Sequence, residues 1–147
     1  MISPTKLADE LAVISQIDPR AASAITLSGD VFDMSKWEKA LAILQVGTIL
    51  SGTVDLKFQC AASATASYAD FSPAKAITQF TAADDNKQAL LNLKGSELPD
   101  GKRWVKPVVT VAAVGSAGNY VSLTVLGGVG RHLPAADNDV ASVDEIV

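Results

Sequence analysis

Residues that could carry out chemistry are sparse in this chain, and its one glycine-rich cluster is GGVGR at residues 127–131. A phosphate-binding loop requires the pattern G-x-x-x-x-G-K-[ST], and no Lys-Ser or Lys-Thr pair follows these glycines. A dinucleotide-binding turn requires a helix directly after the glycines, but Leu133 and Pro134 follow closely. The cluster therefore indicates the end of a strand, where glycine permits a positive φ or close backbone packing.

Two other sets of polar residues have the types that catalysis or metal binding uses. Asp84 and Asp85 are adjacent and fit a solvated turn, whereas glycosidase carboxylates flank a substrate from separate elements. Cys60 and His132 have the types of a nucleophile pair, but Cys60 lies on the apolar side of a predicted strand, where thiols usually pack as inert residues. Residues 137–139, DND, lack the glycine and the spacing of a calcium loop. We therefore expect no catalytic residues, no cofactor, no metal and no enzymatic activity.

An aromatic ligand platform is a further possibility. Trp104 and Tyr120 would neighbour each other on one sheet face if their strands formed a hairpin. Packing within the sheet is the simpler interpretation of the pair, and a carbohydrate-binding β-sandwich module stays open as an alternative.

Strands with a period of two supply the elements that would position these residues. Apolar and polar side chains alternate strictly over residues 53–60 and again over 119–126. Residues 103–111 are β-branched, although Pro107 cannot donate to a ladder and so predicts an edge or a bulge. Residues 115–118, GSAG, predict a hairpin between the last two strands. The predicted core face consists of Leu41, Ile43, Val54, Leu56, Phe58, Val121, Leu123 and Val125.

The complete pattern predicts an all-β fold, an antiparallel β-sandwich of about seven or eight strands that is Ig-like or jelly-roll-like. Weaker strand patterns cover residues 23–27, 40–46, 76–80 and 88–93, with turn signals between them. We predict an N-terminal arm over residues 1–20, a sandwich domain over 21–134 and an irregular acidic C-terminal tail over 135–147.

The terminal segments are the parts predicted to bind a partner. A short helix over residues 6–14 would carry an apolar stripe too small to form a core, so it must pack on its own sandwich or on a neighbour. The tail carries four acidic residues and no basic one, and it is either solvated or an arm that docks on a partner. The candidate partner-binding residues are Leu7, Leu11, Ile14, Arg131, Ile146 and Val147.

Composition limits the classes of function further. The 147 residues carry a formal net charge of -4, which argues against a nucleic-acid partner. No apolar run approaches the roughly 20 residues that span a bilayer, so we expect no membrane partner. A single cysteine excludes an intrachain disulfide. Edge strands of a sandwich have to be covered, which favours a homo-oligomer, a dimer or a trimer.

Five stretches resemble a family of small proteins encoded beside the major capsid protein in the head modules of tailed phages. They are structural signatures without a catalytic pattern, and together they span roughly residues 25–135. The glycines at 127–130 depart from the family pattern, and the N-terminal segment and the acidic tail have no counterpart in it. The five are residues 32–37 (FDMSKW), 42–47 (AILQVG), 52–57 (GTVDLK), 102–106 (KRWVK), and 121–128 with Arg131 and Pro134.

This resemblance implies a head decoration, or cement, protein of a tailed bacteriophage. Such a protein is made in the host cytoplasm, binds the major capsid protein lattice on the outer surface of the head, and stabilises the capsid. Many identical copies would supply avidity from individually weak contacts. The alternatives are another virion component, such as a head–tail connector or tail protein, and the carbohydrate-binding module.

Overall fold

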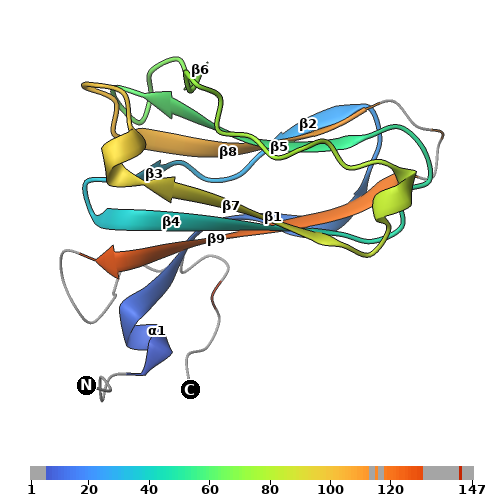
Figure 1. Cartoon of the computed structure of the whole chain (residues 1–147), viewed down its shortest axis with the longest axis horizontal. Helices are drawn as coiled ribbons and strands as arrows, with labels where there is room; N and C mark the ends of the chain where they lie inside the picture. The colour runs from blue at the N-terminus through green and yellow to red at the C-terminus, as the bar shows by residue number, and fades with distance from the viewer. Residues whose placement is uncertain (1–5, 113–114, 116–117, 131–142, 144–147) are drawn as a thin grey trace.

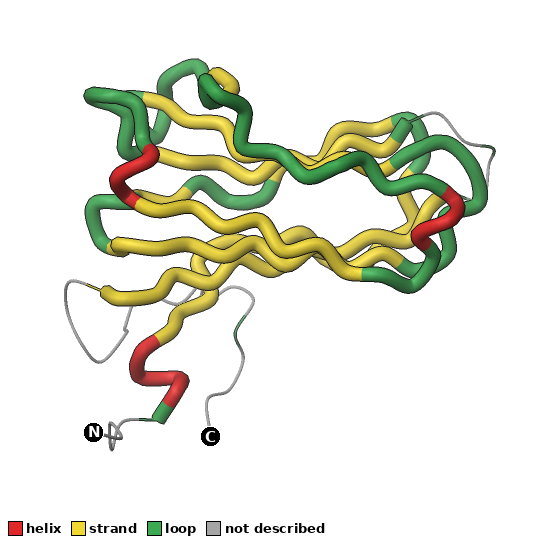
Figure 2. Tube along the Cα trace, viewed as in Figure 1, coloured by secondary structure: helices red, strands yellow, loops and turns green. Residues whose placement is uncertain are grey.

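Two antiparallel sheets lie face to face in the computed structural model, which describes residues 6–112, 115, 118–130 and 143 (Figures 1 and 2). The described part has nine strands, so the prediction of an antiparallel β-sandwich is confirmed. The elements are α1 (Leu7–Glu10), β1 (Leu11–Ala22), β2 (Ile25–Ser28), β3 (Phe32–Asp33), β4 (Trp37–Val46), β5 (Val54–Ala61), β6 (Ala69–Asp70), the 3-10 turn η1 (Ala82–Asp84), β7 (Gln88–Lys94), the 3-10 turn η2 (Gly95–Glu97), β8 (Trp104–Val111) and β9 (Asn119–Gly130).

One layer is a four-stranded sheet in the order β1-β9-β4-β7, which places β1 and β7 at its edges. The other layer is a five-stranded sheet in the order β2-β8-β5-β6, with the short β3 also paired to β8. Helix α1 projects from the four-stranded layer on the side away from the five-stranded sheet (Figure 1). The four-stranded sheet therefore has one face in the core and one outer face, and α1 lies on the outer side.

The core between the sheets contains most of the predicted apolar set. Val54, Leu56, Phe58, Val121, Leu123 and Val125 are each at most 3% exposed. The prediction was wrong for β4, where Leu41 and Ile43 lie on the outer face and Ala42 and Leu44 are fully buried. Residues 40–44 read ALAIL and are apolar on both faces, so alternation alone does not identify the inner one.

The N-terminal segment differs from the prediction. The helix expected over residues 6–14 covers only Leu7–Glu10, and the chain then enters β1. Residues 11–20, assigned to an arm, are therefore part of an edge strand of the sandwich. Ile14 and Ile17 are each 7% exposed and pack in the core, and this burial favours the strand over a helix.

The hairpin predicted over residues 115–118 does not exist, because β8 and β9 belong to different sheets. The connection between them crosses from one layer to the other. Trp104 accordingly pairs with Ala61 and with Asp33, whereas Tyr120 pairs with Ala21 in the other sheet. The proposed platform of two neighbouring aromatic rings is therefore wrong.

Pro107 lies in an interior strand, not at an edge. Its carbonyl oxygen accepts a bond from the Gly29 N–H at 3.0 Å, so its backbone faces the break between β2 and β3. The N–H that proline lacks would point into this break, where no ladder bond is lost. A local interruption of the neighbouring strand, and not an edge position, accommodates the proline.

The remaining predicted strands have mixed outcomes. β2, β4 and β7 confirm three of the four weaker ones. Residues 76–80 form only isolated bridges to β5, at Ala76 and at Phe80. The tail predicted over residues 135–147 lies outside the described residues except for Val143.

Candidate interaction surface

The outer face of the four-stranded sheet carries a band of apolar side chains. The strand registers place Val13 beside Leu126 and Leu126 beside Leu41, and they place Ile43 beside Leu90. Four of these side chains are half-buried, and Leu90 is 60% exposed. We call Val13, Leu41, Ile43, Leu90 and Leu126 the apolar stripe. An apolar stripe on an outer sheet face is unusual, because such faces are normally solvated and polar.

A groove of about 570 Å³ lies at one end of the apolar stripe. Leu11, Leu41 and Leu126 line it, together with Lys39 and Lys94. Gly128 makes room for Leu11, because a Cβ at position 128 would lie 3.2 Å from the Leu11 Cδ2. The groove thus combines an apolar floor with two cationic side chains, an arrangement suited to an apolar segment that carries acidic groups.

A second hollow, of about 610 Å³, lies at the opposite end of the sheet. Tyr120 is 54% exposed there and is surrounded by the polar residues Gln45, Gln88 and Ser122. Gly47 permits this placement of the ring, because a Cβ at position 47 would lie 3.0 Å from the Tyr120 Cβ. An exposed aromatic ring beside amide and hydroxyl groups can stack on a ligand and donate hydrogen bonds to it.

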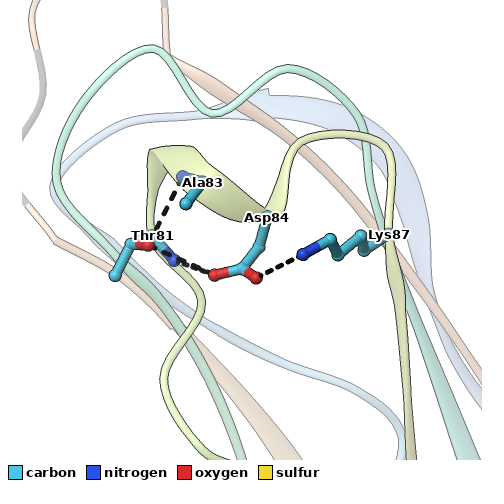
Figure 3. Close-up of polar contacts among 4 residues, drawn as sticks. All are labelled: Thr81, Ala83, Asp84 and Lys87. Atoms are coloured by element: carbon cyan, nitrogen blue, oxygen red, sulfur yellow. Dashed lines mark hydrogen bonds and ion pairs between the residues drawn. The ribbon is translucent and has the colours of Figure 1, made fainter.

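Lys87 lines the second hollow and is held by Asp84 in the capped 3-10 turn η1, which precedes β7 (Figure 3). Its Nζ donates to the Asp84 Oδ1 at 2.9 Å, and the Thr81 N–H donates to the Asp84 Oδ2 at 2.9 Å. The Thr81 N–H, with help from Lys87, lowers the pKa of the Asp84 carboxyl. Asp84 is therefore a structural cap that orients a surface cation.

The two hollows on this face are lined by more cationic than acidic side chains. Four cations and one acid line the two hollows, whereas the complete chain has a net charge of -4. The charged residues in question are Arg20, Lys39, Lys87, Lys94 and Glu10. When Asp84, which pairs with Lys87, is included, four cations stand against two acids, so the two hollows are basic regions of an acidic molecule.

The outer face of the five-stranded sheet has a different character. Lys57 forms an ion pair with Asp70 at 2.8 Å, and the same carboxylate accepts a bond from Gln59. The Lys57 and Gln59 bonds lower the pKa of Asp70. The Gln79 amide donates to the Asp55 Oδ2 at 2.7 Å on this side. These polar groups already bond to one another, so this face has less to offer a partner.

The candidate partner-binding residues from the sequence fall into three groups. Leu7 is 68% exposed on α1, and Leu11 is half-buried in the groove, so both lie on the outer side of the four-stranded sheet. Ile14 is 7% exposed and belongs to the core of the chain itself. Arg131, Ile146 and Val147 lie outside the described residues.

Sequence reasoning missed the apolar stripe. The sequence pattern predicts Leu41 and Ile43 in the core, and it places Leu90 and Leu126 in strands without distinguishing them from their neighbours. The available signal was that β4 is apolar on both faces, a pattern typical of a strand covered on both sides.

The side chains considered for catalysis have structural roles where they are described. Burial raises the pKa of the Cys60 thiol, which has no exposed surface. The Asp85 Oδ1 accepts the Ile49 N–H at 2.6 Å. Among the residues that the structure describes, no cluster of three metal-ligating side chains occurs, and no helix has the length and apolarity to span a membrane.

No protein-family model matches the chain, and no curated protein matches it. Among solved structures, it is similar to one from Bacillus endospore appendages, described as a family of disulfide-linked pili. That likeness has 13% identity and a TM-score of 0.45, and it covers 87% of this chain and 97% of the other. A second likeness, to a structure of infectious bursal disease virus, has 17% identity and a TM-score of 0.36, and it covers 85% of this chain. This chain spans about a third of that viral protein. Both TM-scores lie below 0.5, so neither likeness assigns this chain to a known fold family.

Proposed function

We propose that this protein is a structural virion component of a tailed bacteriophage, a head decoration protein that binds the major capsid protein lattice and stabilises the head. The outer face of the four-stranded sheet is its docking surface in this proposal. The carrying observation is the apolar stripe between two hollows lined by cations. The resemblance of residues 25–135 to proteins encoded beside the major capsid protein supplies the identity of the partner.

The physical basis of the proposal is the combination of polarity and charge on that face. An exposed contiguous apolar patch rimmed by polar residues is typical of protein interaction sites. The cations at both ends favour an acidic partner surface. Repetition of this contact across a lattice would raise the overall avidity. Binding should weaken as salt increases, because exposed charges are screened beyond about 8–10 Å at physiological ionic strength.

The test is to add purified protein to phage heads that lack it and to count bound copies per particle. A Leu41→Lys variant puts a charge into the apolar stripe and should reduce occupancy strongly. Thr110→Lys is the matched control, because Thr110 lies on the outer face of the five-stranded sheet and, like Leu41, is half-buried. Equal occupancy for the two variants, with both folded, would contradict the docking surface.

Copy number distinguishes decoration from the other virion roles. Hundreds of copies per head support decoration, whereas a handful indicates a head–tail connector or a tail component. A different result would assign the contact to the tail, with Ile146 and Val147. In that case deletion of residues 136–147 abolishes binding, whereas the Leu41→Lys variant still binds.

A carbohydrate-binding module is the second candidate, and the exposed Tyr120 favours it. Its ring lies in a hollow with Gln45, Gln88 and Ser122, which have the donors and acceptors that sugars need. Glycan-array binding that disappears in a Tyr120→Ala variant would support this function over decoration. The absence of any signal on the array would rule out the carbohydrate-binding function.

A further inference from the structure

Strand β7 forms one edge of the four-stranded sheet, and every second residue of it directs its backbone away from the sheet. The Val46 N–H donates to the Lys87 carbonyl at 3.1 Å, so the backbone of Lys87 faces β4. Since backbone direction alternates along a strand, residues 89, 91 and 93 also face β4. Residues 88, 90, 92 and 94 face outward. The Lys94 N–H agrees with this assignment, because it turns back to the Glu97 Oε2 at 2.8 Å.

Three outward-facing positions on β7 have no backbone partner in the described part of the chain. These are Gln88, Leu90 and Asn92, and their side chains are exposed. Leu90 is the most conspicuous, because 60% of this leucine is open to solvent. Unpaired N–H and C=O groups in a row are a template for pairing with another strand.

The other edges of the sandwich are interrupted or covered. β1 contains Pro19 and has two register irregularities, and β2 has only four residues. The free side of β5 is covered by residues 69–80, through bonds such as Phe58 N–H to the Lys75 carbonyl at 2.8 Å (Figure 2). β7 has neither a proline nor a register irregularity along its seven pairs with β4. It lacks these devices by which proteins block edge-to-edge pairing.

We propose that two copies of this chain pair through β7 in antiparallel fashion, about a two-fold axis beside Leu90. The three unpaired positions are symmetric about Leu90. Leu90 then meets Leu90 of the partner subunit, and Gln88 meets Asn92 of the partner subunit in both directions. Each such pair exchanges two backbone bonds, so three pairs give about six bonds and use every unpaired group at those positions.

Side chains are compatible with this register and favour a second copy over an unrelated strand. The two exposed Leu90 side chains meet on the outer face and join the two apolar stripes into one. Lys87 lies opposite Leu93 of the partner subunit, and Lys94 lies opposite Asn86 of the partner subunit, so no like charges face each other. A two-fold interface needs one surface that is complementary to itself, and β7 has that property. The dimer goes beyond the proposed function and does not depend on capsid binding.

The experiment measures mass and cross-linking of the full chain in solution, without phage particles. Light scattering should give about 30 kDa, twice the 15.2 kDa of one chain, with dissociation on dilution. Leu90→Pro should give a monomer, because it removes an outward N–H that β4 does not use. A melting midpoint near that of wild type shows that this variant is folded. A wild-type monomer at every concentration would overturn the proposal.

Cysteine variants test the register itself. In the proposed dimer the two Cα atoms at position 90 lie about 5.5 Å apart, within the range of a disulfide. Leu90→Cys should therefore form a covalent dimer under mild oxidation, and the native Cys60 is fully buried. Gln88→Cys is the matched control on the same strand and face, and it should cross-link far more slowly, because its counterpart is position 92. Equal cross-linking at 88 and 90, or none at 90, would contradict the two-fold register.

Discussion

Phe58 has no exposed surface, and its ring packs edge-on against Phe32 at a centroid distance of 6.2 Å. Phe58→Ala should therefore lower the free energy of unfolding by about 3–5 kcal/mol, because it leaves a cavity in a closely packed core. Denaturant titration measures the change. Leu50→Ala serves as the comparison, since Leu50 is 52% exposed, and it should cost under about 1 kcal/mol. A loss as small as this for Phe58→Ala would contradict its placement.

Acid should destabilise the fold through three carboxylates. Hydrogen bonds from Lys57, the Thr81 N–H and Lys75 lower the pKa values of Asp70, Asp84 and Glu97, respectively. A pKa that is lower in the folded state adds stability above the unfolded value of about 4, and this stability disappears as the pH falls through the folded pKa. The melting midpoint should be level from pH 7 to about 5 and should fall below about 4. In Asp70→Asn the acid-dependent fall should be smaller, and an identical profile would exclude the contribution of Asp70.

The β5 strand could be predicted from its residues, whereas the inner face of β4 could not. In β5 every second side chain is polar, so the buried face follows directly from the sequence. In β4 the small residues Ala40 and Ala42 face the core, and the larger Leu41 and Ile43 face outward. Because the larger residues are usually the buried ones, residue size favoured the wrong face. The apolar stripe went unrecognised for the same reason.

At the scale of elements, β4 and β9 pack closely where Trp37 crosses Gly127. A Cβ at position 127 would lie 2.6 Å from the Trp37 Cδ2, and Trp37 is only 3% exposed. Gly127→Ala should therefore destabilise the protein by about 1–3 kcal/mol through overpacking. Gly115→Ala is the control, because a Cβ there meets nothing within 4 Å. Similar melting midpoints for the two variants would contradict the close packing.

This packing explains the glycine cluster that the sequence made conspicuous. Close approach was one of the two expected reasons for it, and Gly127 confirms that reason. The positive φ expected of the glycines falls instead on Val129, at 53°. The local sequence shows that position 127 is glycine, but it does not show why. The Trp37 ring, which leaves no room for a Cβ there, comes from a strand about 90 residues earlier. The short GSAG segment is typical of a hairpin, but the sequence around it does not show that β8 and β9 belong to different sheets.

At the scale of the whole molecule, the N-terminal boundary of the sandwich can be tested by truncation. Removing residues 1–10 deletes α1, which has no buried residue, so the melting midpoint should change by at most a degree or two. Removing residues 1–20 also deletes most of β1 with the core residues Ala12, Ile14 and Ile17, so cooperative melting should be lost. Thermal unfolding followed by circular dichroism compares the two. A stable fold without residues 1–20 would restore the arm that the sequence predicted.

Under the decoration function proposed above, the difference between the two outer faces also sets the thickness of the protein layer on the head. A molecule bound through its four-stranded sheet presents its five-stranded sheet to the solvent. The charged groups there are already engaged, as in the pair between Lys57 and Asp70. A further molecule that arrives from solution therefore meets a polar, hydrated surface whose charged groups are already paired, and it meets no apolar stripe there. We therefore expect the proposed protein layer to be one molecule thick.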